Sequence, residues 1–506
     1  MTSTSPAEPS AKPPRLRRWL VRAGFVLACL VTLTVALYLE EKIRGRAAWA
    51  AYEARARQRG VKLDFADYVS PKIPDAENFA SIPIFDAVFR ASDANEIPPN
   101  PFKDYGAAID AANVGRPIPS APLPSAPLLQ KRIDLAAWQK FFVEAKLLPT
   151  AGESAAADVL KVIDTYAAPL AQLREAGTRP HCRFPVHWEK LYAARLPHLG
   201  ILRLASQLYA LRLSAHLALG QSEAAYEDFR DGFHLTTATF EDPSLISGLV
   251  RIAMASIMEN AVWDGLAGRQ WAEPELRKIE ADLAALDWLK DYLFAMGSER
   301  GFSNLMTEML IENPRQLAEI MRIPGSVEQP PPAFAFALYP AGWFYQSKVR
   351  SNHFFDEVFA RIDAGQRRYF GERPIPSSAN DIRSLPQKTY YMIFAYLAPA
   401  LEHVAVGNRY VQTASVTDLA RLACALERCR LARGAFPQAL AELTPDFLAT
   451  LPAEIVNGEP YHYRRTDDGS FVLYSVGLDL RDDGGIINLK KPSKGQADWV
   501  WQYPAP

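Results

Sequence analysis

The residues best suited to metal chemistry lie near the C-terminus, in a loop bounded by glycines. Asp479, Asp482 and Asp483 follow an alternating apolar segment. Carboxylate oxygens held in a turn are the ligands that Ca²⁺ prefers. The spacing does not fit an EF-hand, because Arg481 and Lys490 occupy its third and twelfth positions. We predict a minimal calcium site at the three aspartates. The alternative is a solvated acidic turn, in which the Asp side chains bond their own backbone.

A second group of possible ligands lies in the middle of the chain, where His181, Cys182 and His187 are close together. One cysteine between two histidines lacks the fixed spacing of a zinc site, so ordinary loop or core use is the simpler interpretation. Cys424 and Cys429 are five positions apart on a predicted helix and face different directions. We interpret them as packing residues.

Acid–base chemistry would draw on His187, His198 and Glu299. The segment Gly297-Ser298-Glu299-Arg300 superficially resembles a hydrolase elbow, but its serine is second rather than central. Glu299 and Arg300 are more simply an ion pair. The sequence contains no Walker loop, His-Glu-x-x-His or dinucleotide-binding fingerprint.

The element that positions the whole protein is an uncharged run of 17 residues, Ala23 to Leu39. With residues 19–22 it reaches the roughly 20 residues that cross a bilayer. Trp19 and Tyr38 stand at its two ends, where interfacial aromatic residues belong. A buried core helix is the alternative, but a segment behind a Pro/Ser-rich tail has nothing to pack against. We predict that residues 19–39 span a membrane.

The run exceeds a usual signal-peptide core, and no small-x-small site follows it directly, so we predict an uncleaved signal-anchor. Basic residues flank both sides of the span in nearly equal numbers, so the positive-inside count does not by itself decide the orientation. A short basic tail usually stays in the cytoplasm, so the large C-terminal part is expected outside it, in the periplasm of a bacterial inner membrane. The flanking residues are Lys12, Arg15, Arg17, Arg18 and Arg22 before, and Lys42, Arg44, Arg46, Arg55, Arg57 and Arg59 after.

After the span, Glu40 to Arg59 reads as a helical continuation that ends at Gly60. Residues 61–128 are rich in Pro and Asn and are predicted to be irregular, with Pro-Ser-Ala-Pro-Leu repeated at 119–128. A Pro/aromatic insert occupies 324–346 and is interpreted as a loop over the core or a docking surface. Helical periodicity predicts helices at about 189–219, 222–240, 244–267, 272–296, 352–370 and 388–404.

The last hundred residues change character. A helix is predicted from about Val411 to Arg433, followed by a short segment to Leu443. Tyr461 to Arg465 and Phe471 to Val476 alternate as two strands around Asp468-Gly469, a strong hairpin signal.

The fold class is therefore mainly α: a single N-terminal transmembrane helix, a large helical domain and a small C-terminal α+β module with an antiparallel sheet. The predicted organisation is a cytoplasmic tail and anchor (1–46), a helical stalk and Pro-rich arm (47–128), the helical domain (129–404) and the module (405–506).

The C-terminal module resembles the soluble domain of type II secretion major pseudopilins. The resemblance is carried by Arg430 to Pro437, the turn at 440–443, Tyr474 to Asp479 and the Asp-Asp-Gly-Gly at 482–485. It covers about 95 residues (411–506 of the sequence). In that family the corresponding loop binds Ca²⁺, so the resemblance implies calcium at the three aspartates. The pilin helix and prepilin peptidase site should directly precede such a module, but neither does, and the membrane span lies far upstream.

The whole chain also resembles a group of uncharacterised, membrane-anchored bacterial proteins that share the element Pro74 to Ala80 (Pro-Asp-Ala-Glu-Asn-Phe-Ala). This resemblance implies architecture and location, and no known activity.

Composition excludes several classes. With 56 Lys+Arg against 57 Asp+Glu there is no basic excess for nucleic acid, and four Cys are too few for a disulfide scaffold. The leading hypothesis is a single-span, membrane-anchored envelope protein with a structural or protein-interaction role, in contact with other envelope proteins. The alternatives are a membrane-anchored hydrolase or lipid-handling enzyme with a site in the helical domain, and a secretion-system component.

Overall fold

The computed structural model describes the chain except for residues 1–14, 116–131, 314–338, 372–399, 487–497 and 504–506. Two compact units are distinguished. The first comprises Met1–Val61, Met306–Ser351 and Leu385–Ala398, and the second comprises Lys62–Leu305, Asn352–Ser384 and Pro399–Pro506. The described part is mainly helical with a small antiparallel sheet near the C-terminus, which confirms the predicted fold class.

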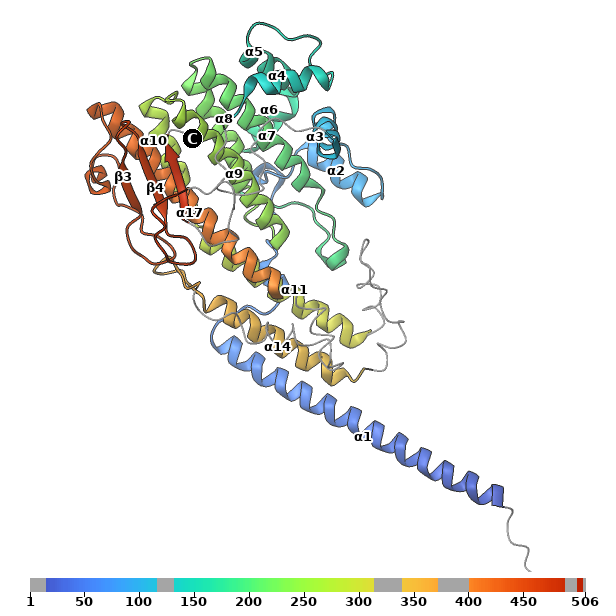
Figure 1. The fold of residues 1–506 in the computed structure, drawn as a ribbon. Coiled ribbons are helices and arrows are strands. Elements are labelled where there is room, and N and C mark those ends of the chain that lie inside the picture. Colours follow the sequence, from blue (N-terminus) through green and yellow to red (C-terminus); the bar gives the residue numbers. More distant parts are fainter. Residues whose placement is uncertain (1–14, 116–131, 314–338, 372–399, 487–497, 504–506) are drawn as a thin grey trace, which may run out of the picture. The chain divides into compact units, whose positions relative to one another are not determined.

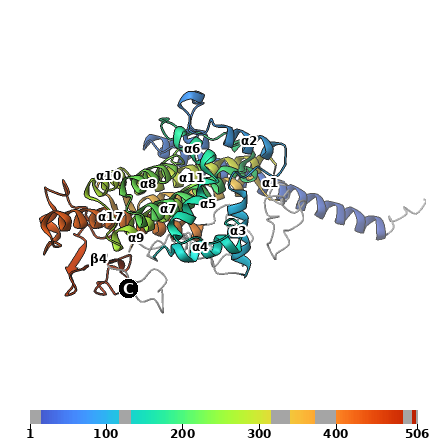
Figure 2. The same ribbon diagram turned by 90° about the horizontal axis from the view of Figure 1, so that it is seen from above.

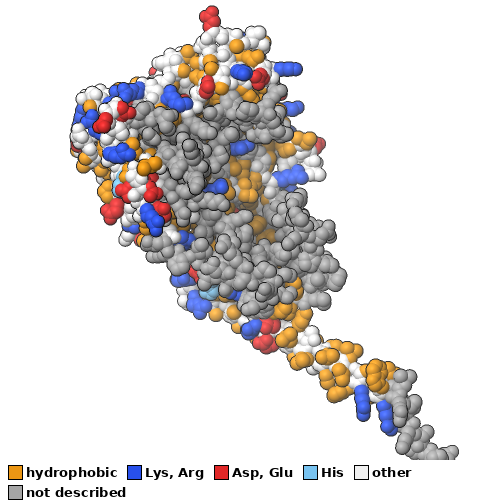
Figure 3. Space-filling model, in the orientation of Figure 1, with side chains coloured by type: hydrophobic (Ala, Val, Ile, Leu, Met, Phe, Trp, Pro, Cys, Tyr) orange, Lys and Arg blue, Asp and Glu red, His pale blue; other side chains and the backbone are white. Residues whose placement is uncertain are grey.

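In the first unit, helix α1 (Arg15–Gln58) contains the predicted membrane segment and its continuation. The apolar side chains of this segment are exposed on all sides, with Leu27 63% and Leu33 69% accessible. Figure 3 shows hydrophobic side chains along this helix and Lys or Arg side chains near its N-terminal end. By length and composition the segment could cross a membrane. A second described helix passes the same test, but it is largely buried in the core of the second unit.

The end of α1 follows the sequence signal. Gly60 has a φ of 75°, a left-handed conformation that glycine adopts without strain. The Val61 N–H donates to the Ala56 carbonyl at 3.0 Å, as in a Schellman motif. The predicted stop at Gly60 is confirmed.

The second half of α1 packs against the start of helix α14 (Ala341–Phe359). A Cβ built on Gly45 would lie 2.5 Å from the carbonyl oxygen of Gly342, so the two backbones are in direct contact. Beside this contact, Gln346 Nε2 donates to Glu41 Oε2 at 3.0 Å. The two helices thus approach each other where neither has a side chain.

The second unit is built around helices α7 (Pro197–Ala218), α8 (Ser222–Thr237) and α9 (Leu245–Ala267), which lie side by side in Figure 1. Gly232 of α8 marks the point where all three meet. A Cβ there would lie 2.7 Å from Met258 Sδ of α9 and 2.9 Å from Tyr209 Cβ of α7. Residues along the contacting faces are almost fully buried. This three-helix contact is the centre of the core.

Other helices complete this part of the fold. Among them, α2 and α5 pack on α7, and α4 packs on α5. Their bounds are α2 (Pro83–Asp93), α3 (Lys103–Gly115), α4 (Leu135–Glu144), α5 (Ala155–Asp164), α6 (Ala167–Ala176), α10 (Glu273–Ala284) and α11 (Trp288–Glu312), and short 3-10 turns cover Phe65–Tyr68, Asp75–Glu77, Trp188–Ala193 and Leu440–Leu443.

The long helix α17 (Ala400–Arg433) joins the helical core to the sheet. It packs on α9 and α10, as Figures 1 and 2 show for α10, and it also packs on β4 and β5. The sheet order is β3 (His462–Arg465), β4 (Phe471–Ser475), β5 (Trp499–Tyr503), all antiparallel. Gly469, with a φ of 74°, makes the β3–β4 turn, which confirms the predicted hairpin. A two-stranded ribbon, β1 (Ile362–Asp363) with β2 (Arg368–Tyr369), was not predicted.

Several predicted element limits were wrong. Residues 61–128 contain α2 and α3 rather than only irregular chain. The helix expected from Glu189 begins at Pro197, because proline lacks an N–H and keeps the preceding residue out of helical conformation. The helix expected at 272–296 is two helices, since the Asp287 side chain accepts from Lys290 N–H (3.0 Å) and starts α11. The 119–128 repeat, the 324–338 part of the insert and Lys490 lie outside the described residues.

A fully buried ion pair connects α9 to α11. Arg251 donates from Nε to Asp291 Oδ2 (2.9 Å) and from Nη2 to Oδ1 (2.5 Å), and neither side chain is exposed. Arg251 Nη1 also donates to the Thr239 carbonyl, and its guanidinium lies over the Phe240 ring, 4.8 Å from the centroid. Burying both charges is tolerated only because each has several partners.

Removing one member of this pair is expected to leave an uncompensated buried charge. We predict that Asp291→Ala lowers the free energy of unfolding by about 3–5 kcal/mol, measured by denaturant titration of the detergent-solubilised chain. The double variant Arg251→Met/Asp291→Leu should recover most of that loss. Glu144→Ala, which breaks an exposed 4.0 Å contact to Lys140, should cost below about 1 kcal/mol. An equal loss of unfolding free energy in Asp291→Ala and Glu144→Ala would contradict the prediction.

Candidate functional site

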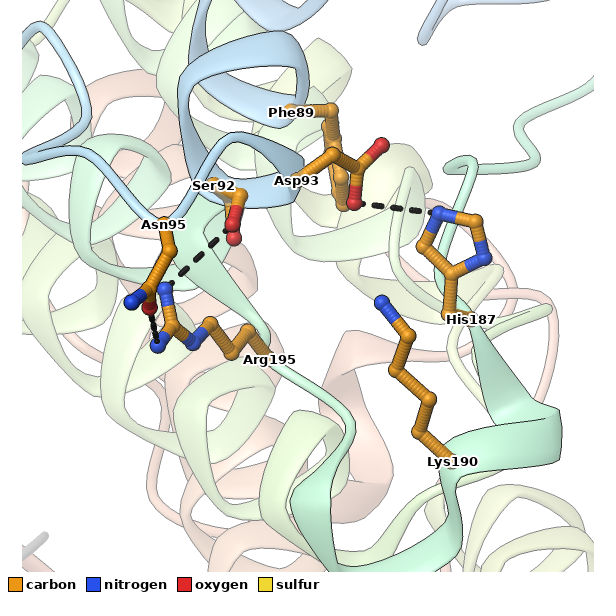
Figure 4. Close-up of a pocket in the computed structure, with 7 residues that line it drawn as sticks. All are labelled: Phe89, Ser92, Asp93, Asn95, His187, Lys190 and Arg195. Atoms are coloured by element: carbon orange, nitrogen blue, oxygen red, sulfur yellow. Dashed lines mark hydrogen bonds and ion pairs between the residues drawn. The ribbon is translucent and has the colours of Figure 1, made fainter.

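An open pocket of about 280 Å³ lies in the second unit between the C-terminal end of α2 and the segment leading into α7. Figure 4 shows the Lys190 ammonium pointing between His187 on one side and Arg195 on the other. The lining is polar except for one aromatic ring. It consists of Phe89, Ser92, Asp93, Asn95, His187, Lys190 and Arg195.

The segment Pro74 to Ala80 connects the two walls of this pocket through hydrogen bonds. Asn78 accepts from Arg183 N–H at 2.8 Å through Oδ1 and donates to the Arg183 carbonyl at 3.0 Å through Nδ2. Phe79 N–H donates to the His181 carbonyl at 2.8 Å. Arg179 Nη1 adds a bond to the Asn78 carbonyl at 2.9 Å. The chain just before α2 is therefore fixed to the chain just before His187.

His187 is held between two carboxylates. Its Nε2 lies 3.0 Å from Asp93 Oδ1, and its Nδ1 lies 2.7 Å from Glu189 Oε1. Hydrogen bonds to Asp93 and then to Glu189 raise the pKa of His187 above its ordinary value of 6.5, against a small opposing effect of burial. The imidazole is therefore biased toward its cationic form, with a proton on each nitrogen.

Arg195 closes the opposite side of the pocket at the end of α2. Its Nη2 donates to Asn95 Oδ1 at 2.5 Å and its Nη1 to the Ser92 carbonyl at 3.3 Å. Asn95 has a φ of 58°, a left-handed conformation that asparagine tolerates better than most residues. A cation is favourable there because the last carbonyls of a helix carry partial negative charge.

His198 belongs to the core and not to the pocket surface. It is fully buried, with Nε2 2.7 Å from Asp242 Oδ2. Its ring stacks on Phe184 at 3.9 Å and on Phe89 at 5.6 Å between centroids. Ser247 Oγ donates to the same Asp242 oxygen at 3.3 Å. Phe89 thus lies between His198 and the pocket, and among the described residues no hydrogen bond or ring contact joins His198 to His187.

Glu299 has a role at a helix end. Its Oε1 accepts from the Leu245 N–H at 3.0 Å, at the first turn of α9, where unpaired N–H groups favour a carboxylate. Arg300 does not bond it in any described contact but donates to Asp356 Oδ1 at 2.9 Å.

The cysteines are all free, and Cys182, Cys424 and Cys429 are buried while Cys29 is exposed on α1. Burial raises the pKa of the Cys182 thiol, with a further contribution from Asp242, so it is a poor nucleophile. Among the described residues, no group of three or more His, Cys, Asp or Glu side chains is arranged to hold a metal ion.

The aspartate loop is bonded largely to itself. Asp482 Oδ1 accepts from Tyr474 Oη at 2.9 Å and from Gly484 N–H at 2.8 Å. Asp479 Oδ1 accepts from Arg481 N–H at 3.2 Å, and Asp483 is exposed. The bonds from Arg481 and Gly484 are those of the self-bonded acidic turn, whereas the bond from Tyr474 comes from β4. Calcium at Asp479, Asp482 and Asp483 stays a prediction.

The sequence singled out His187 but not its neighbours in the pocket. Asp93, Asn95, Lys190 and Arg195 come from two segments about a hundred positions apart, and single-chain spacing gives no signal for such a meeting. One local signal was available. Asp93 stands in the last turn of an amphipathic helix. A carboxylate there is disfavoured by the helix dipole and is stabilised by a nearby cation.

The contacts of His187 with Asp93 and Glu189 predict how its protonation depends on pH. Because the folded-state pKa is raised, the stabilisation from this contact is complete below pH 6.5 and is lost as the pH rises through the folded-state pKa. In NMR titrations of the histidine ring, His187 should show a midpoint above 6.5, and Asp93→Asn should lower that midpoint. Asp86→Asn, an exposed carboxylate on the same helix, should leave it unchanged. A wild-type midpoint at or below 6.5 would refute the arrangement.

No protein-family model, curated protein or solved structure matches the chain. The resemblance to major pseudopilins at 411–506 and the resemblance to membrane-anchored bacterial proteins therefore stay predictions from the sequence. The function is argued below from the geometry of this chain.

Proposed function

We propose that the protein is a single-span, signal-anchored protein of a bacterial inner membrane, with a structural or protein-interaction role in the envelope. The observation that carries the proposal is the exposure of the apolar half of α1. Leu30 and Leu33, near the centre of the uncharged run, are 56% and 69% exposed. Apolar area left in water costs about 25 cal/mol per Å². A hydrocarbon environment removes that cost, and the flanking basic residues then lie at the two interfaces.

The rest of the chain is proposed to lie in the periplasm. A short basic tail before a first span tends to remain in the cytoplasm, and large domains translocate largely regardless of their charge. The part after the span is about nine-tenths of the 506 residues. Contacts with other envelope proteins would involve this part.

The geometry supports binding better than hydrolysis. A general base needs a ring nitrogen free to take a proton from the nucleophile or water. Both nitrogens of His187 face carboxylates, and His198 is sealed in the core. Glu299 is engaged at the start of α9. These positions favour binding over the hydrolase and lipid-handling alternatives, and a secretion-system role rests only on the C-terminal resemblance.

Membrane insertion can be tested by placing charges in the centre of the span. Leu30→Arg/Leu33→Arg should cost about 5–7 kcal/mol of insertion free energy, since each central Arg costs about 2.5–3.5 kcal/mol. The wild-type chain should stay in the membrane pellet after alkaline carbonate extraction, and the double variant should appear largely in the supernatant.

The matched control places the same charges on the continuation of α1. Ala51 and Ala54 are exposed there, and Ala51→Arg/Ala54→Arg should fractionate as wild type. Release of the wild-type chain by carbonate, or identical behaviour of the two double variants, would refute the anchor.

The orientation is tested separately. Alkaline phosphatase fused after Pro506 should be active, because it folds only outside the cytoplasm, whereas green fluorescent protein at the same point should be dark. The reverse pattern would retain the anchor and overturn the periplasmic placement.

A further inference from the structure

We propose that the pocket between α2 and the segment 187–195 binds a small molecule through a phosphate or carboxylate group, with Lys190 and Arg195 as its charged contacts. This is a ligand site in the helical part of the chain, independent of the membrane anchor. The sequence hypotheses assigned no ligand to it.

The first argument is the balance of charge. His187, biased toward the imidazolium form, joins Lys190 and Arg195 as a third cation around the pocket. Asp93 and Glu189 supply the negative charge, and both are engaged with His187. Three cations and two carboxylates leave one positive charge uncompensated around the pocket. An anion entering between Lys190 and Arg195 completes the balance.

The second argument is unused hydrogen-bonding capacity. The Lys190 ammonium makes no described side-chain hydrogen bond, although it points into the pocket (Figure 4). Its described electrostatic neighbour is Glu189, the residue before it in the chain. Arg195 has five N–H donors, and its two described bonds go to a neutral carbonyl and a neutral amide. A phosphate or carboxylate would take charge-assisted bonds from both side chains, which are about twice as strong as neutral ones.

The third argument is the arrangement of the walls. Phe89 is the apolar member of the lining and is rigid, because it stacks on Phe184 and His198 in the core. Asp93 lies on the side of His187 and would repel a second anionic group there. The pocket therefore suits a ligand with one anionic end and an apolar or aromatic body. A volume of about 280 Å³ is near the lower end of small-molecule sites.

The test uses the full chain in uncharged detergent at low salt, since exposed charges are screened at high ionic strength. The probes are inorganic phosphate, phenyl phosphate, benzoate and a short-chain phosphatidic acid below its micelle concentration, titrated by isothermal calorimetry. We expect saturable binding of phenyl phosphate or benzoate, with inorganic phosphate weaker because it lacks the apolar body. Tighter binding of phosphatidic acid than of phenyl phosphate would identify a lipid headgroup as the source of the anion.

Three variants make the test specific. Lys190→Gln should weaken binding roughly tenfold or more, and Lys190→Arg, which keeps the charge, should retain most of it. Lys161→Gln removes an exposed lysine on α5 away from the lining and should bind as wild type. The proposal is overturned if no probe binds saturably, or if Lys190→Gln and Lys161→Gln weaken binding equally. It is also overturned if Lys190→Arg loses as much as Lys190→Gln, because the contact would then not depend on charge.

Discussion

The second unit depends on one buried charge, the guanidinium of Arg251. Placing it out of water is unfavourable unless its donors are engaged, and here each of its three nitrogens donates to Asp291 or to the Thr239 carbonyl. These partners belong to α11 and to the turn after α8, while Arg251 itself is on α9. Three segments must therefore meet at one place and in one register. A hydrophobic contact would tolerate sliding between helices, and this pair does not.

The same turn brings several other polar groups of the unit together. His198 bonds Asp242, Ser247 bonds Asp242, and Glu299 bonds the first turn of α9. These are acid–base residue types in a close group, which is what a catalytic interpretation looks for. The burial of His198 and Asp242 gives these two a structural role, because a hydrogen-bonded pair closed to solvent fixes the chain rather than reacting with a substrate. Phe89 packs on His198, so the same buried group holds this part of the pocket wall in place.

What could be predicted from the sequence was local. The uncharged run after Ala23, the stop at Gly60 and the hairpin at Asp468-Gly469 each depend on residues adjacent in the chain, and each was recovered in the described structure. The start of α7 was predicted at about Glu189, whereas the helix begins at Pro197. The prediction gave the helical periodicity of the apolar residues more weight than the proline. The pocket could not be predicted, since Asp93 and His187 meet only after Asn78 joins their segments.

A comparison of the two charged sites shows why the pocket is the better candidate for a ligand. In the C-terminal loop, Asp482 already accepts bonds from Tyr474 and Gly484, so a cation would have to displace partners that the fold supplies. In the pocket the position is reversed, because the Lys190 ammonium has no described side-chain hydrogen bond to give up. Asp93 is a second indication of a binding site. Its carboxylate lies at the C-terminal end of α2, where the helix dipole disfavours negative charge, and the contact with His187 stabilises it there. Local disagreement between a residue and its element is the pattern that binding sites leave in an otherwise consistent fold.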